Sequence, residues 1–451
     1  MGFRFLTAGE SHGPALAATL EGLPAGIPIS ADAVALDLGR RQRGYGRGAR
    51  MTIEQDRAEI LAGVRHGRTL GSPILLLVRN RDWENWTRVM QVEALSDQEA
   101  AELADLAAGG NKRAQPVTRV RPGHADLAGA LKYGFDDVRD VLERASARET
   151  TARVAAGAVC RAFLRQLGIE AWSFTAEVGD VALDPGAASR TRAEAEASPL
   201  RCPDPEAEVR MIAAVDEARS AGDTLGGVFQ VVVTGVPIGL GSHVHWDRRL
   251  DGALAQAICS IHAVKGVEFG LGFEQTRRRG SGVHDVITGI GEDADSPGIP
   301  GLDEGPVRRW LHRTNAAGGL TGGISNGEPI VVRGAVKPIS TLARPLPSAD
   351  LRTGQPVEVA HYERSDISVV PAAGVIGEAM VLLTLSRFVL EKFGGDSLPE
   401  VRDNLARYRQ RTVAMADGDA AQAGAGSTGT GAGRRTPDAA GEAESGSGGD
   451  D

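Results

Sequence analysis

The chain has 451 residues, of which 42% are hydrophobic and 24% charged, an ordinary composition for a globular protein. Its net charge is −9, and the residues from 416 onward contribute two arginines against seven acidic residues, so the rest is only mildly acidic. Nucleic-acid binding usually needs a broad basic face, and this balance argues against one.

The cysteines and the N-terminus indicate the compartment. Cys160, Cys202 and Cys259 are scattered and form no Cys-x-x-Cys pair, which favours reducing surroundings. The N-terminus lacks a charged-then-apolar signal segment, and no uninterrupted apolar run approaches the roughly 18 residues that span a bilayer. We therefore expect a cytoplasmic protein that does not bind a membrane.

Hydrophobic periodicity predicts a mixture of strands and helices without a strict strand–helix–strand rhythm. The predicted strands are 3–8, 17–20, 74–78, 229–234 and 330–335. The predicted helices are 150–167, which stops at Gly168, 250–264, and 374–393, which stops at Gly394. This mixture favours an α+β fold.

Composition divides the chain into two regions. No linker interrupts residues 1–410, which predicts one large catalytic domain. Residues 411–451 are a low-complexity acidic tail, and after Met415 they contain no large apolar residue. Such a segment cannot bury enough apolar surface to offset its ordering entropy, so we expect disorder there.

The first motif along the chain is Gly9-Glu10-Ser11-His12-Gly13, directly after a predicted strand. It fits the Gly-x-Ser-x-Gly elbow of a serine hydrolase, which needs a strand before it and a helix after it. A glycine-rich turn whose Ser11 and His12 bond local backbone groups is the plainer alternative. Histidine titrates near neutral pH, so His12 is also a candidate proton carrier.

Arginines crowd the next segment, where they alternate with glycines: Arg40, Arg41, Arg43, Arg47 and Arg50. Guanidinium forks match phosphate and carboxylate oxygens, so this segment suits a loop that folds over a small anion. A solvated basic loop is the alternative. His243, His245 and Asp247 form a weaker cluster without a recognisable further ligand, and we expect no metal site.

A second arginine cluster stands before the helix predicted at 150–167. Ser146 or Thr150 can cap that helix, and backbone N–H groups at such an end attract anions. Arg144 and Arg148 add positive charge, although ordinary capping explains the pattern equally well. Two further polar clusters, 121–126 around His124 and 364–366 around Asp366, complete what reads as one acid–base site for an anion.

Six segments in this order resemble the chorismate synthase family: 9–16, 40–52, 121–126, 144–157, 337–341 and 364–366. The runs 121–126 and 144–150 are specific, unlike the Gly-x-Ser-x-Gly match, and the resemblance covers nearly all of 1–410. It implies a single β-α-β sandwich domain and a homotetramer. It also implies a lyase that converts 5-enolpyruvylshikimate-3-phosphate to chorismate and phosphate by 1,4-anti elimination with reduced FMN.

The resemblance also implies roles for single residues. The implied proton-handling residues are His12, His124 and Asp366. The implied substrate-binding residues are Ser11, Arg41, Arg47, Arg50, Arg121, Arg148 and Arg364. The implied flavin-binding residues are Arg144, Ala145, Ser146, His262, Ala263, Gly322, Lys337, Pro338, Ile339, Ser340, Thr341 and Arg364.

The chain departs from the family pattern at two flavin positions. Family members often have two serines after the first arginine of the 144–150 motif, so Ala145 retains only backbone contact. Some relatives carry an amide at the position of His262. Without a recognisable reductase segment, we expect a separate flavin reductase to supply reduced FMN, with NADPH as an indirect reductant. A hydrolase built on Ser11 and a non-catalytic anion-binding protein are the alternative functions.

Overall fold

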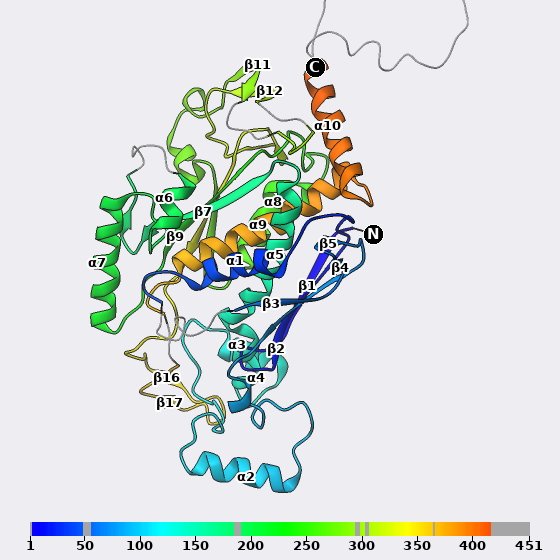
Figure 1. Ribbon diagram of the computed structural model, residues 1–451. Helices are drawn as coiled ribbons and strands as arrows, with labels where there is room; N and C mark the ends of the chain where they lie inside the picture. The colour runs from blue at the N-terminus through cyan, green and yellow to red at the C-terminus, as the bar shows by residue number, and fades with distance from the viewer. Residues whose placement is uncertain are drawn as a thin grey trace, which may run out of the picture.

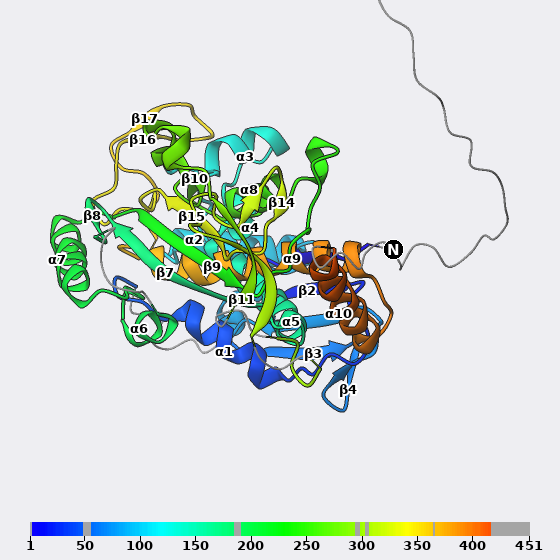
Figure 2. The same ribbon diagram turned by 90° about the horizontal axis from the view of Figure 1, so that it is seen from above.

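The computed structural model describes residues 2–47, 56–184, 191–293, 298–302, 306–363 and 366–415. Two antiparallel β-sheets form the outer layers, and helices pack between them (Figures 1 and 2). The predicted α+β fold and its β-α-β sandwich architecture are therefore confirmed.

The first sheet has the strand order β1-β2-β6-β3. Its strands are β1 (Arg4–Ala8), β2 (Ala15–Glu21), β6 (Ile74–Arg79) and β3 (Ala58–Ala62). Leu16, Ala18 and Leu20 alternate along β2 and are buried, as the two-residue period of a strand requires when one face is covered. Helix α5 (Thr150–Arg165) covers this face.

The second sheet has the strand order β10-β15-β9-β7-β8. Its strands are β10 (Val264–Phe269), β15 (Ile330–Val336), β9 (Gly227–Thr234), β7 (Glu170–Val178) and β8 (Val181–Ala182). Phe229, Val231 and Val233 point from β9 into the core, against helix α9 (Val370–Phe393).

Helices α5 and α9 pack side by side in the middle of the sandwich, together with α1 (Ala31–Gln42) and α8 (Leu250–Cys259). A Cβ atom at Gly157 of α5 would lie only 2.4 Å from the Cβ of Ala379 in α9. This closeness requires glycine, because any side chain would force the two helices apart. The central contact therefore fixes the distance between the two halves of the sandwich.

Helix α9 is long and apolar enough to cross a membrane by length and composition alone. Most of it is buried, however, between α5 and the second sheet (Figure 1). Val381, Leu382 and Leu385 have no exposed surface. Its apolar character is thus that of a core helix.

The remaining helices cover the edges and the connections. They are α2 (Asp97–Ala108), which projects from the body in Figure 1, α3 (Asp126–Tyr133), α4 (Arg139–Ala145), α6 (Arg192–Ala197), α7 (Pro205–Ala221) and α10 (Leu398–Ala414). The 3-10 turns are η2 (Trp83–Asn85), η3 (Ala147–Glu149), η4 (Trp246–Arg248), η5 (Gly272–Arg277) and η6 (Gly280–Gly282).

Four short hairpins complete the described part of the chain. They are β4 (Val64–Arg65) with β5 (Arg68–Thr69), β11 (Ile287–Asp293) with β12 (Val307–His312), β13 (Leu320–Thr321) with β14 (Ile324–Ser325), and β16 (Ser348–Ala349) with β17 (Pro356–Val357).

All five predicted strands and the helices predicted at 150–167 and 374–393 are present, with bounds that shift by a few residues. The helix predicted at 250–264 is too long. It ends at Cys259, because Ala263 adopts a positive φ of 65° and Val264 already pairs in β10. Helix α10 continues past residue 410 to Ala414, and the tail from 416 lies outside the described residues.

Candidate active site

The turn between β1 and β2 carries Ser11 and His12, both buried. The Ser11 N–H donates to the carbonyl of Glu143 at 3.0 Å, which ties the turn to α4. A strand follows the turn, so the strand–turn–helix geometry of a hydrolase elbow is absent here. The Ser11 hydroxyl meets the Ser146 hydroxyl at 3.2 Å rather than an imidazole, and the hydrolase interpretation loses its basis.

His12 is held from two sides. Its Nδ1 lies 2.9 and 3.1 Å from the two carboxylate oxygens of Glu143. Its ring stacks on Trp86, with ring centroids 3.9 Å apart and an angle of 25° between the planes. Among the described residues, none hydrogen-bonds to Nε2, which leaves that nitrogen available to a ligand.

Arg41 lies just before the end of α1 and is buried. Its Nε donates to the Thr150 hydroxyl at 3.0 Å, and its Nη2 donates to the Ala147 carbonyl at 3.0 Å. Burial, together with the charges of Arg47 and Arg148, lowers the pKa of Arg41 to about 10. A bound anion would reduce the electrostatic repulsion among guanidinium groups that are crowded in this way.

Two carboxylates join this arginine cluster. Asp56 lies 3.6 Å from Arg41 and 3.6 Å from Arg148, and Asp366 lies 3.2 Å from Arg47. Asp366 therefore belongs to the same cluster as the arginines. The predicted site residues Arg50 and Arg364 lie outside the described residues.

The segment that joins α4 to α5 connects the arginine cluster to the β1–β2 turn. The Ser146 hydroxyl donates to Ser11 and accepts from the Arg148 N–H at 3.3 Å. Ser146 thus caps the 3-10 turn η3, whereas no side chain caps α5 itself. The helix cap expected at Ser146 is displaced by one short turn, so that Ser146 contacts both Ser11 and the Arg148 N–H.

The loop before α3 holds Arg121 and His124 around Asp126. Arg121 donates to Asp126 at 2.8 and 3.0 Å, and His124 contacts the same carboxylate through Nδ1. Although burial opposes ionisation, hydrogen bonds from His124 and Arg121 keep the pKa of Asp126 well below its usual range. Asp126 therefore orients both side chains as a permanent anion.

Glu363 connects this loop to the rest of the site. Its carboxylate lies 3.8 Å from Arg121 and 3.4 Å from His361. Burial opposes ionisation, but His361, Arg121 and His12 lower the pKa of Glu363 to about 2. Glu363 stands three residues before Asp366, so one short segment meets both the Arg121 group and the Arg47 group.

Three of the predicted flavin-binding residues, Ala263, Lys337 and Thr341, lie at one edge of the second sheet. Val264 pairs with Val336, which brings the start of β10 beside the end of β15. Lys337 donates its N–H to the Ala263 carbonyl at 2.9 Å, and its Nζ donates to the Gly123 carbonyl at 2.9 Å. The Thr341 hydroxyl lies 3.4 Å from Arg121. This edge therefore adjoins the His124 loop.

His262 carries the observation that best fits a bound cofactor. Its Nδ1 is buried and has no hydrogen-bond partner among the described residues. Burial lowers the pKa of His262, and Arg153, His124 and Arg144 act in the same direction against the opposing charge of Glu149. A neutral imidazole with an orphaned nitrogen is expected to bond to a ligand.

The other predicted flavin positions differ in their surroundings. Arg144 donates to the carbonyls of Thr7 and Gly9 at 3.0 Å each, and the carbonyl of Ile339 accepts from Thr224 at 2.8 Å. Gly322 lies apart, in the turn of the β13–β14 hairpin, where its neighbour Gly323 packs against Arg249. No contact among the described residues brings Gly322 to the cluster.

Known proteins match this chain over most of its length. Residues 3–390 match the chorismate synthase family. Relatives called chorismate synthase, from Solibacter usitatus (strain Ellin6076) and Trichlorobacter lovleyi (strain ATCC BAA-1151 / DSM 17278 / SZ), are 53% and 54% identical. Each alignment covers 90% of this chain and 98% of the relative.

The chain belongs to the chorismate synthase family. A solved structure described as a crystal structure of chorismate synthase is 40% identical, covers 92% of this chain and 99% of its own, and gives a TM-score of 0.68. The resemblance inferred from six segments is thereby confirmed. So is the enzyme class, a lyase of the shikimate pathway and of aromatic amino acid biosynthesis.

Three residues of the site were missed from the sequence: Trp86, Glu143 and Glu363. Glu143 directly precedes the Arg144 motif that marks the chorismate synthase family, and this adjacency was the available signal. Glu363 likewise directly precedes the 364–366 cluster. Trp86 stands in a segment without a recognisable pattern, and only the fold brings it to His12.

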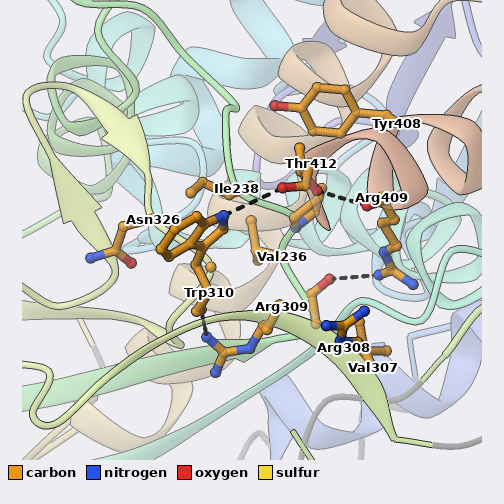
Figure 3. A pocket seen from close by; sticks show the side chains of 13 residues that line it. Val236, Ile238, Val307, Arg308, Arg309, Trp310, Asn326, Tyr408, Arg409 and Thr412 are labelled. Atoms are coloured by element: carbon orange, nitrogen blue, oxygen red, sulfur yellow. Dashed lines mark hydrogen bonds between the residues drawn. The ribbon is translucent and has the colours of Figure 1, made fainter. Parts of the chain in front are cut away.

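A separate groove lies between α10 and β12 (Figure 3). Trp310 donates from its indole to the Thr412 carbonyl at 3.3 Å, and Arg409 reaches the Gly235 carbonyl at 3.4 Å. Its lining includes none of the site residues inferred from the chorismate synthase resemblance. The groove is therefore distinct from the candidate active site.

Proposed function

We propose that this cluster binds 5-enolpyruvylshikimate-3-phosphate and eliminates phosphate from it to form chorismate. The observation that supports this most directly is the cluster of Arg41, Arg47 and Arg148. Arg121 lies beside His124, and Glu363 interacts with both Arg121 and His12. The chorismate synthase family catalyses this lyase reaction, the last step of the shikimate pathway.

The positive charges of the arginines complement the negative charges of the substrate. The substrate carries a phosphate and two carboxylates, and guanidinium forks bind such groups bidentately. In this proposal, Arg41, Arg47 and Arg148 hold one anionic end, with Arg50 and Arg364 from their neighbouring segments, and Arg121 holds another. Ser11 adds a hydroxyl donor. Burial of Arg41 strengthens its attraction for the anion, because fewer water molecules screen the charge.

The 1,4-anti elimination involves proton transfer at two places, the departing phosphate and the ring carbon at position 6. The carbon–oxygen bond to phosphate breaks, and a proton leaves the ring carbon at position 6. His12 is proposed as the acid that pairs with the departing phosphate through its available Nε2. Asp366 and His124 are proposed to handle protons at the flavin side of the site, with Asp126 orienting His124.

The residues present fit reduced FMN. The Nδ1 of His262, which has no partner among the described residues, can form a hydrogen bond to the flavin. The backbone at Ala263, with a φ of 65°, can approach the flavin closely. The proposed flavin-binding set is Arg144, Ala145, Ser146, His262, Ala263, Gly322, Lys337, Pro338, Ile339, Ser340, Thr341 and Arg364. When bound, reduced FMN supplies the electronic chemistry of the elimination, without net redox change.

We propose a cytoplasmic homotetramer that receives reduced FMN from a separate flavin reductase, with NADPH as an indirect reductant. The support is the family membership and the absence of a recognisable reductase segment in the sequence.

The test is anaerobic turnover of 5-enolpyruvylshikimate-3-phosphate with photoreduced FMN, followed by the absorbance of chorismate. We expect product with reduced FMN and none with oxidised FMN, which serves as the matched control. Absence of product with flavin binding intact would point to a different substrate. Absence of both would return attention to Ser11, whose labelling by a fluorophosphonate would then support a hydrolase.

A further inference from the structure

His12 is fixed by main-chain and side-chain contacts to one carboxylate. Glu143 accepts the His12 N–H at 2.7 Å through Oε2, and the same carboxylate faces Nδ1 of the ring. The Glu143 side chain is only 2% exposed, and Arg139 lies 3.6 Å from its Oε1. Both carboxylate oxygens of Glu143 therefore face Nδ1 of the His12 ring within hydrogen-bonding distance.

Trp86 fixes the plane of the same imidazole. The indole is itself held in place, because its Nε1 donates to Asp82 at 2.9 Å. The guanidinium groups of Arg139 and Arg113 lie over its ring, 5.4 and 5.5 Å from the centroid. The indole therefore forms a rigid wall, against which the His12 ring cannot rotate freely.

We infer that Glu143 and Trp86 are positioning residues for the acid of the elimination, an inference that rests on the proposed function. Glu143 accepts the Nδ1–H of His12, so the ring carries its transferable proton on Nε2. Trp86 keeps Nε2 directed away from α4 and toward the anion site. In the same way, the aspartate of a Ser-His-Asp triad orients the catalytic imidazole through its Nδ1–H.

Other charged groups besides Glu143 lie near His12. Glu363 interacts with the charge of His12 from the segment before Asp366, and Glu10 lies in the same turn as His12. Arg139 acts on His12 through Glu143. Only Glu143 makes a direct hydrogen bond to the His12 ring among the described residues, so removal of its charge has the most specific effect.

The experiment compares the pH dependence of kcat in the wild type, Glu143→Gln and Glu143→Asp. We expect Glu143→Gln to lower kcat by at least about tenfold, within the ~10⁴-fold limit for loss of a proton-transfer group. Its alkaline limb should move to lower pH, because the imidazolium has lost its anionic partner. Glu143→Asp retains the charge and should return the limb toward the wild-type position. KM should change little in either variant.

The matched control is Asp140→Asn, which removes one negative charge from the exposed side of the same helix. It should leave both kcat and the alkaline limb unchanged. Trp86→Leu removes the stacked ring but keeps Glu143, so it should lower kcat without moving the limb. This contrast separates orientation of the ring from stabilisation of its charge.

A second readout needs neither substrate nor flavin. An imidazolium quenches a stacked indole, so the fluorescence difference between the wild type and Trp86→Phe reports the protonation of His12. Its midpoint should fall in a Glu143→Gln background. An unmoved midpoint and an unmoved alkaline limb, in a variant that still melts cooperatively, would overturn the inference. Wild-type protein without turnover would instead contradict the proposed function, while the fluorescence titration still decides the role of Glu143.

Discussion

The two site histidines are held by different carboxylates. His12 faces Glu143 of α4, and His124 faces Asp126 at the start of α3. Each carboxylate leaves one ring nitrogen for chemistry, so each imidazole has one defined direction for proton transfer. His245 also pairs with a carboxylate, Asp247, but both side chains are more than half exposed and lie outside this cluster.

Replacement of either site histidine tests its proposed role in proton transfer. We expect His12→Ala and His124→Ala each to lower the turnover rate by ~10²–10⁴-fold, because each removes a proposed proton-transfer group. His245→Ala, which removes an exposed histidine in a similar pair, should leave the rate unchanged. Turnover is measured anaerobically with saturating reduced FMN. Near-normal turnover in either site variant would remove that residue from the mechanism.

Residue types predicted the cationic half of the site better than the anionic half. Arginines interleaved with glycines are visible as a pattern, and Arg41, Arg47 and Arg148 indeed meet. Glu143 and Glu363 border recognised motifs and Asp56 does not, but no residue type in these segments indicates which partner each carboxylate meets. Their importance comes from tertiary contacts with His12, Arg121 and Arg148, and such contacts have no local sequence period.

At the scale of elements, the two neighbouring arginines at the end of α1 have different surroundings. Arg41 turns toward the site, whereas Arg40 turns into the core and binds Glu378 of α9 at 2.7 and 2.8 Å. Glu378 also accepts from Arg161 and from the Ser173 hydroxyl. This fully buried carboxylate therefore links α1, α5, α9 and β7, and it holds the helix end that presents Arg41.

Loss of the Glu378 charge is expected to destabilise the sandwich. Glu378→Gln removes one of the two carboxylates that Arg40 and Arg161 share, the other being Asp37, and it should lower the free energy of unfolding by up to about 3–5 kcal/mol. The exposed pair of Glu391, on the same helix, with Arg248 provides the control, and Glu391→Gln should change stability by less than about 1 kcal/mol. Denaturant unfolding measures both, and equal effects would contradict the linking role.

The lowered pKa of Glu378 should make the stability of the protein depend on pH. Burial opposes ionisation, but Arg40 and Arg161 keep the pKa of Glu378 well below its usual range. Its contribution is therefore complete above the unfolded pKa near ~4.3 and is lost as the pH falls below it. The stability of Glu378→Gln should consequently fall less steeply on acidification than that of the wild type.

Boundaries of elements were predicted well where glycine marks them and poorly where backbone strain does. Gly168 and Gly394 stop α5 and α9 close to the expected positions. The helix expected to reach 264 stops at Cys259, because the chain must turn at Ala263 to enter β10. Alanine is a strong helix former, so its positive φ could not be read from residue type.

At the scale of the whole molecule, the β-α-β sandwich followed from the family resemblance, while periodicity alone indicated only mixed strands and helices. The strand order β1-β2-β6-β3 places β6 beside β2 and moves β3 to the edge. Alternating burial predicts that a strand exists, but it does not say which strand is its neighbour. Partners depend on contacts between distant segments.

The tail is expected to be dispensable for catalysis. Residues 416–451 contain no large apolar side chain, so their deletion should leave turnover and Tm essentially unchanged. Truncation at 397 is the contrasting variant, since it also removes α10 with the buried side chains of Val401 and Leu405. That variant should lose several degrees of Tm. A large effect of the shorter deletion would show that the tail supports the fold.

The central position of α9 has a consequence for how a cell makes this protein. Arg40 and Glu378 are separated by 338 positions, so the first sheet, α1 and α5 leave the ribosome long before the helix that completes their core. Until then their apolar faces remain uncovered, a state that favours aggregation and chaperone binding. A nascent chain released before α9 would be a client for degradation rather than a smaller enzyme.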